Sequence, residues 1–213
     1  MTQKGIIGIA SQEVPKHVGF ETAKDSLQRP DGTLLSRMVG NNIAHNYNRV
    51  MRFALENDMD WVWLIDDDHV FVPDVLMRLL AHELPVVFPL NIRRVAPYET
   101  TIHDALDDGL RQNTWDQLRG WSGLTDIGNK NIGSSGMLIR REAIEKIGDP
   151  WYLNAHSIPE NLSFDLEFSE KLRSNGYKIY VDMDTRIGHI GHIAAWPVCN
   201  KEGNWSYELR TVI

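Results

Sequence analysis

The fold is decided by the stretch Trp61-Val62-Trp63-Leu64-Ile65-Asp66-Asp67-Asp68-His69. Its first five residues are apolar without alternation, which is typical of a strand buried on both faces of a parallel sheet. The apolar run ends abruptly in acidic residues. Pro73 then begins a helix predicted over residues 74–82, because proline's missing N–H costs nothing in the first turn. Strand, polar end and helix in that order form the unit of an α/β fold.

The rest of the chain repeats this alternation of strands and helices. We expect a single domain over residues 1–213, with a mostly parallel central sheet flanked by helices. In such sheets, ligands bind beyond the carboxyl ends of the strands. Further strands are predicted at 5–10, 85–90, 136–140 and 178–182. Helices are predicted at 33–57 (with an interruption possible at 40–42), 142–147 and 163–175. Long loops are expected at 11–32 and 91–131, and the tail 192–213 contains no recognisable motif.

Composition limits the classes of function. The 213 residues contain 22 Lys and Arg against 29 Asp and Glu, a net charge of −7. This acidic balance argues against non-specific binding to nucleic acid, which needs a basic face. The single cysteine, Cys199, rules out an internal disulfide or a Cys-rich zinc site. No stretch reaches the roughly 20 apolar residues of a transmembrane segment. We therefore expect a cytoplasmic protein.

The acidic cluster is a candidate metal site. Asp66 and Asp68 are expected to point to the same side, because side chains alternate along an extended chain. Their repulsion would raise one pKa unless a divalent cation lies between them. Oxygen ligands suit Mg²⁺ or Mn²⁺, and an added imidazole favours Mn²⁺. His189, between two nearby glycines, is the candidate third ligand and His192 its substitute. The alternative is a solvated turn that caps the following helix.

Residues 63–73 resemble the strand–DxD–helix segment of GT-A-fold nucleotide-sugar glycosyltransferases, especially the small family-2-like type found in phages, bacteria and archaea. Residues 133–141 resemble the family's G-x-G-φ-φ-φ-R-R strand, and residues 164–182 its E-D-x-x-F…G-Y-x-φ-x-x-D segment. His189 falls at the family's late histidine. The match covers about residues 5–192 in order. Two positions depart from the pattern: Phe164 replaces a glutamate, and Tyr47 replaces an arginine.

The resemblance implies a GT-A (Rossmann-like) fold and a metal-dependent glycosyltransferase. The donor would be a UDP- or GDP-sugar, and the acceptor a glycan, a protein or a small molecule. Mn²⁺ or Mg²⁺, held by Asp66, Asp68 and His189, would stabilise the departing diphosphate. Asp165 matches the base that takes the acceptor's proton, although a first-turn aspartate is also explained by the helix dipole. The residues expected to contact the donor are Ser11, Glu13, Asn48, Asp66, Asp67 and Arg93.

Several residues and the function itself allow more than one interpretation. Arg93 and Arg94 follow a predicted strand and could hold phosphate or acceptor oxygens, or form a solvated loop. Trp115 and Trp121 could form an acceptor lid or anchor a long loop in the core. A nucleotidyltransferase is a second enzyme hypothesis, although the loop after the first strand is neither Gly-rich nor basic. A catalytically silent nucleotide-sugar-binding module is the third, supported by Phe164.

Overall fold

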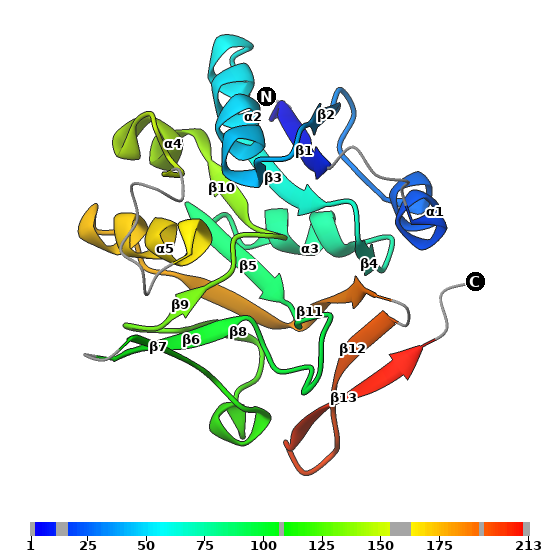
Figure 1. Cartoon of the computed structure of the whole chain (residues 1–213). Helices are drawn as coiled ribbons and strands as arrows, with labels where there is room; N and C mark the ends of the chain where they lie inside the picture. Colours follow the sequence, from blue (N-terminus) through cyan, green and yellow to red (C-terminus); the bar gives the residue numbers. More distant parts are fainter. Residues whose placement is uncertain (1–2, 12–16, 107–108, 154–162, 192–193, 211–213) are drawn as a thin grey trace.

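A ten-stranded sheet runs through the middle of the molecule (Figure 1). The order of hydrogen-bonded strands across the sheet is β13-β12-β11-β5-β10-β3-β1-β2, and β4 and β8 also pair with β11. Strands β2, β1, β3, β5 and β11 point the same way, and β10 runs antiparallel between β3 and β5. The prediction of an α/β fold with a mostly parallel central sheet flanked by helices is confirmed.

The computed structural model describes residues 3–11, 17–106, 109–153, 163–191 and 194–210. The strands of the large sheet are β1 Gly5–Ser11, β2 Leu34–Val39, β3 Trp61–Asp66, β4 His69–Phe71, β5 Val86–Leu90, β8 Leu124–Asp126, β10 Leu138–Arg140, β11 Tyr180–Ile190, β12 Ala194–Cys199 and β13 Trp205–Arg210. A second sheet has the order β7-β6-β9 and contains β6 Ile102–Leu106, β7 Gly109–Gln112 and β9 Asn131–Ile132. The helices are α1 Val18–Ser26, α2 Ile43–Glu56, α3 Val75–Ala81, α4 Arg141–Ile147 and α5 Phe164–Ser174, with a 3₁₀ turn η1 at Trp115–Leu118.

Strand β3 is buried on both faces, as its sequence predicts. Trp61, Trp63 and Ile65 pack in one core cluster with residues of α1 and α3. Val62 and Leu64 alternate with them and pack on the opposite face with residues of α2, α4 and α5. Full burial of each such side chain contributes roughly 1.5–3 kcal/mol. This strand therefore holds the aspartates at its end in a fixed position.

Two predictions for the N-terminal part were wrong. The segment 11–32 was expected to be a loop, yet residues 18–26 form α1. Its nine residues bury only Gly19, Phe20 and Ala23, too few to give a visible helical period. The helix expected over 33–57 is an edge strand, β2, followed by α2. The possible interruption at 40–42 is confirmed there: the Asn42 side chain accepts a hydrogen bond from the His45 N–H at 2.9 Å and caps α2.

The segments without a readable period contain strands. Residues 91–131 hold β6, β7, η1 and β8, and the tail holds β12 and β13. β6 pairs with the adjacent β7, and β12 with the adjacent β13, but these strands are short and mix polar with apolar residues, so their sequences carry no clear alternation. The helix ends were predicted well: Gly148 follows α4 with φ 76° and Gly176 follows α5 with φ 84°, a backbone conformation that favours glycine.

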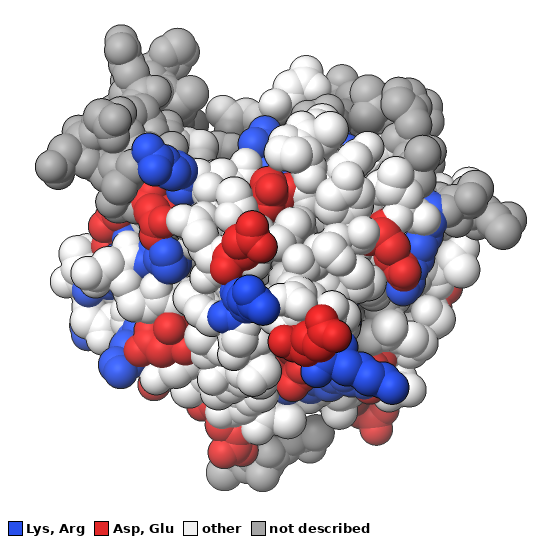
Figure 2. Space-filling model, turned by 90° about the horizontal axis from the view of Figure 1, so that it is seen from below, with Lys and Arg blue, Asp and Glu red and all other residues white. Residues whose placement is uncertain are grey.

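Among the described residues, no helix is both long and apolar enough to span a bilayer. Figure 2 shows the molecule from below the view of Figure 1, with acidic and basic side chains interspersed on this face. Such mixing is the usual state of a solvated surface.

Candidate active site

Two histidines face each other across a pair of antiparallel strands. Strand β4 pairs with β11 so that His69 lies directly opposite His189. Opposed residues of such a pair project on the same side, and the two ring centroids are 4.6 Å apart. The carboxylate of Asp68 lies beside them, and one ligand atom from each of the three residues falls within 4.8 Å of the others. Strand pairing therefore assembles two imidazoles and a carboxylate from two distant segments.

The hydrogen bonds of His189 determine which ring nitrogen is available. Nδ1 lies 3.0 Å from the carbonyl oxygen of Ile92, and because a carbonyl only accepts, Nδ1 carries a proton. Nε2 lies 3.1 Å from Oδ2 of Asp68. At this separation a positive charge must lie between the nitrogen and the carboxylate oxygen, and either a proton on Nε2 or a metal ion can supply it. Two ligands bound at right angles to one metal at about 2.1 Å are roughly 3 Å apart, so the spacing fits a metal.

A neighbouring carboxamide fixes the tautomer of His69. The N–H of Ile92 donates to Oδ1 of Asn91 at 2.7 Å. The amide nitrogen of Asn91 therefore faces Nε2 of His69, 3.4 Å away, and this Nε2 is the acceptor. Nδ1 donates to the hydroxyl of Ser135 at 3.1 Å. Burial, together with the charge of His189, lowers the pKa of His69 to about 3. The ring is therefore neutral, which is the form that binds metal ions.

The third member of the group, Asp68, is ionised. Burial raises its pKa, but the hydrogen bond from His189 and the surrounding positive charges outweigh burial and hold the pKa well below its ordinary value. Nη1 of Arg94 donates to Oδ2 at 2.6 Å. The other oxygen, Oδ1, is buried and has no hydrogen-bond partner in the described part of the chain. A buried, ionised and partly unsatisfied carboxylate beside two imidazoles is a donor set that fits a divalent transition-metal ion.

Asp66 lies beside this group without belonging to it. The Tyr47 hydroxyl donates to its Oδ1 at 2.6 Å, and its N–H donates to the Ser135 hydroxyl at 3.2 Å. Burial, and after it the charge of Asp68, raise the pKa of Asp66 to about 7. The expected repulsion between the two carboxylates is therefore present. The structure gives them different states, with Asp68 ionised and Asp66 partly protonated near neutral pH.

A cleft brings this end of β3 together with α5. Its volume is about 130 Å³, and Asp66 and His189 line it together with Asp165. The other lining residues are Tyr47, His69, Asn91, Thr101, Gly133, Ser134, Ser135 and Phe164. Three of the predicted metal and catalytic residues thus share one cavity. Asp68 does not line it, but its carboxylate lies 3.1 Å from Nε2 of His189, which does.

The two oxygens of Asp165 have different surroundings. Oδ1 accepts hydrogen bonds from the Leu166 N–H at 2.9 Å and from the Ser163 hydroxyl. Oδ2 lies toward Gly133, where an added Cβ would be 3.3 Å from it. Because Gly133 and Asp165 both line the cleft, Oδ2 is the oxygen that a molecule in the cleft can reach.

The residues expected to contact the donor are only partly at this site. Ser11 ends β1 and is buried, next to the register pair Ala10 and Asp66. Asn48 does not line the cleft. Its carboxamide donates to the carbonyl of Tyr152 at 2.7 Å and accepts from the Tyr152 N–H at 2.9 Å, so it fastens α2 to the segment after α4.

The remaining predicted residues lie around the site or outside the described residues. Asp67 is half-buried in the turn after β3, and Arg93 is exposed and lines a neighbouring pocket. Glu13 and His192 lie outside the described residues. Trp115 belongs to the core and Trp121 packs against it. Both therefore anchor the long loop in the core, which was one of the two interpretations of their sequence.

Sequence reasoning missed three residues of the site. His69 is the most important, and its position directly after three aspartates was a usable signal. Tyr47 was noted only as a departure from the family pattern, and Ser135 only as part of a glycine-containing segment. Their roles depend on contacts to Asp66 across 19 and 69 positions of sequence.

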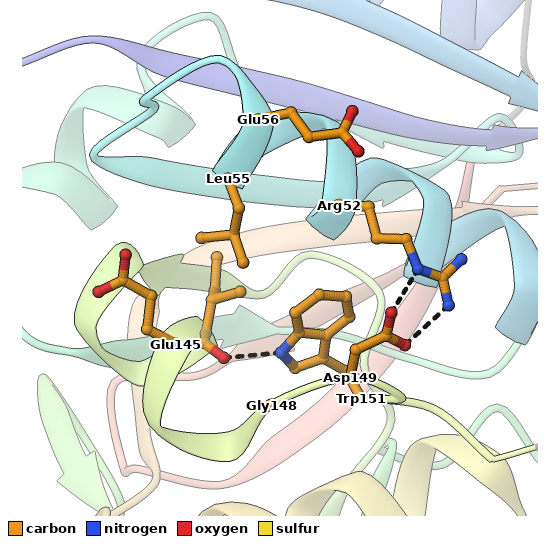
Figure 3. A pocket seen from close by; sticks show the side chains of 8 residues that line it. Arg52, Leu55, Glu56, Glu145, Gly148, Asp149 and Trp151 are labelled. Atoms are coloured by element: carbon orange, nitrogen blue, oxygen red, sulfur yellow. Dashed lines mark hydrogen bonds and ion pairs between the residues drawn. The ribbon is translucent and has the colours of Figure 1, made fainter.

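A separate pocket lies between α2 and α4 (Figure 3). Its volume is about 350 Å³, larger than the cleft, and its lining includes Leu55 and Trp151. Figure 3 shows Arg52 paired to Asp149 at its edge. The guanidinium donates to the two carboxylate oxygens at 2.5 and 2.7 Å. None of the predicted site residues lines this pocket, so its size does not make it the better candidate.

Comparisons with solved structures show the fold. The chain is similar to A197 from STIV, with a TM-score of 0.63 and 15% identity, over 98% of this chain and 94% of that chain. It is also similar to S. aureus TarS 1-349, with a TM-score of 0.57 and 11% identity, over 86% of this chain and 58% of that chain. TarS 1-349 has also been solved with UDP and with UDP-GlcNAc, and those complexes give TM-scores of 0.57 and 0.53 at 12% and 13% identity. No protein-family model and no curated protein matches the chain. The mixed α/β fold is therefore shared with these structures.

Proposed function

We propose that the chain is a metal-dependent glycosyltransferase that moves a sugar from a nucleoside diphosphate sugar to an acceptor hydroxyl. One observation carries the proposal: His69 and His189 of the Asp68–His69–His189 group line the same cleft as Asp165, at the ends of the strands where α/β proteins bind ligands. The likeness to TarS, which has been solved with UDP and UDP-GlcNAc, supports a nucleotide-sugar donor.

The metal would be held by Asp68, His69 and His189. This set differs from the sequence-based set by exchanging Asp66 for His69. Two imidazoles and one carboxylate favour Mn²⁺ or another transition metal over Mg²⁺, which prefers oxygen ligands. When bound, the ion supplies positive charge that stabilises a departing diphosphate.

The residues around the cleft have distinct tasks in this proposal. Asp165 takes the proton of the acceptor hydroxyl at Oδ2, while Ser163 and Leu166 hold Oδ1. Tyr47 and Ser135 keep Asp66 in place at the donor side. Phe164, which stands where the family has a glutamate, gives the cleft an apolar wall.

The test separates binding from turnover. Thermal unfolding is measured with UDP, GDP, UDP-sugars and GDP-sugars, each with Mn²⁺, with Mg²⁺ and without metal. We expect one diphosphate to raise the melting temperature only with metal, and more with Mn²⁺ than with Mg²⁺. Release of diphosphate from the matching sugar nucleotide is then assayed. Binding without release would favour the silent module, and no binding across the panel would reject the proposal.

A further inference from the structure

Two arginines after β5 line a second hollow that adjoins the cleft. Arg93 and Arg94 surround a pocket of about 330 Å³ together with Val95, Thr101 and His189. The cleft shares Thr101 and His189 with this arginine pocket. Because the whole chain carries a charge of −7, two adjacent cations at the edge of the site are a local exception to its acidic character.

The guanidinium of Arg93 is held in place without being neutralised. Its Nη1 donates to Oε1 of Gln112 at 2.7 Å, and Nε2 of Gln112 donates to the carbonyl oxygen of Thr100. The backbone is fixed as well, because the Arg93 N–H donates to the Glu99 carbonyl at 2.9 Å. Among the described residues, no carboxylate pairs with Arg93. A fixed and uncompensated guanidinium is well suited to bind a phosphate or carboxylate group.

Arg94 is compensated by a residue of the metal group. Its Nη1 lies 2.6 Å from Oδ2 of Asp68, and its side chain is 56% exposed. A divalent cation on Asp68 competes for this oxygen and repels the guanidinium. Metal binding therefore leaves Arg94 without a counter-charge, next to Arg93 in the lining of the same pocket.

We propose that the arginine pocket binds an anionic group, of the phosphate or carboxylate class, on the acceptor. This inference rests on the proposed function, in which the donor lies by Asp66, at the carboxyl end of β3 and beside β1. The arginine pocket follows β5, and β10 lies between β3 and β5 in the sheet. The pocket shares His189 with the cleft but not Asp66, which places it on the side away from the nucleotide.

The experiment uses sulfate as a tetrahedral anion that does not precipitate Mn²⁺. Thermal unfolding is recorded against sodium sulfate and against sodium chloride at equal ionic strength, with Mn²⁺, and with and without saturating UDP. Arg93→Gln removes the guanidinium, and Gln112→Glu gives Arg93 a carboxylate partner without removing it. Arg111→Gln is the matched control, because Arg111 precedes Gln112 on β7 and therefore points to the opposite face.

We expect sulfate to stabilise the wild type and Arg111→Gln with Mn²⁺ in both the presence and absence of UDP. Arg93→Gln and Gln112→Glu should each weaken the apparent sulfate affinity about tenfold, the size of one charge-assisted hydrogen bond. Equal responses of all four proteins would overturn the proposal. Loss of the response on adding UDP would also overturn it, because the donor diphosphate would then occupy the pocket. Absence of any UDP binding would instead reject the proposed function.

Discussion

His69 lies directly opposite His189 in the pairing of β4 with β11, and their ring centroids are 4.6 Å apart. This register makes His69 part of the candidate metal group, although His69 and His189 are 120 residues apart in the sequence. The Asn91 amide nitrogen beside Nε2 of His69 and the Ile92 carbonyl beside Nδ1 of His189 give both rings an Nδ1 proton. Each Nε2 therefore carries the lone pair when its ring is neutral, and a metal ion on His69 would replace the hydrogen bond from Asn91.

Replacing His69 should weaken metal binding. His69→Gln removes one nitrogen ligand, and we expect the Mn²⁺ affinity to fall by about 100-fold or more, since loss of outer-shell partners alone costs roughly 10–100-fold. The affinity is measured by titration of Mn²⁺ against the melting temperature. His45→Gln, on an exposed position of α2, is the control and should bind Mn²⁺ as the wild type does. Equal affinities of the two variants would remove His69 from the metal group.

Removing the Tyr47 hydroxyl should destabilise the protein. Tyr47→Phe leaves the buried carboxyl of Asp66 without its 2.6 Å hydrogen bond and should lower the free energy of unfolding by about 1–3 kcal/mol. Urea denaturation measures this change. Tyr207→Phe, on an exposed side chain of β13, should stay within about 0.5 kcal/mol of the wild type. A Tyr47→Phe variant as stable as that control would show that the hydrogen bond is not needed.

The sequence predicts those parts of the fold in which a local pattern and the final environment agree. β3 has five consecutive apolar residues and is buried on both faces. Gly148 and Gly176 mark the ends of α4 and α5, because a glycine after a run of helix-forming residues is a local stop signal. β2 is different, because Leu34, Leu35 and Val39 are partly exposed at the sheet edge, and their spacing suits a helix equally well.

Some residues of the candidate site can likewise be predicted from local sequence, and others cannot. Asp68, Asp165 and His189 could be predicted, because each stands in a short motif at the end of an element or between glycines. His69 has one local signal, its position directly after the aspartates, but its place opposite His189 depends on an antiparallel register with a strand that starts more than 100 residues later. No hairpin turn joins β4 to β11 to set their register, and β4 has only three residues, so its hydrophobic pattern alone does not specify it.

Asp182 should make stability depend on pH on the acid side. Burial raises its pKa, but hydrogen bonds from His82, Thr185 and the Asp184 N–H outweigh burial and lower it. A lowered pKa means that the unfolded chain binds the proton more readily, so this stabilisation is present above pH ~4 and is lost as pH falls below it. Asp182→Asn should lose about 1–3 kcal/mol at pH 7 and approach the wild type near pH 3.

Melting temperatures of the wild type, Asp182→Asn and Asp184→Asn between pH 3 and 7 provide the measurement. Asp184 is exposed on the same strand, so its replacement should leave the pH profile of the wild type unchanged. A constant difference between Asp182→Asn and the wild type across this range would show that the ionised carboxylate is not the stabilising form.

Asp165 should control turnover without controlling binding. Asp165→Asn keeps the shape of the side chain, and its Oδ1 can still accept from Leu166, but the group can no longer take a proton at Oδ2. Loss of a general base typically costs about 10²–10⁴-fold in rate. We therefore expect kcat for sugar transfer to fall by that factor while metal-dependent UDP binding stays the same. Asp116→Asn, exposed on η1, is the control for the loss of one negative charge. Unchanged kcat in Asp165→Asn would exclude it as the base, and a parallel loss of UDP binding would make it a donor-binding residue instead.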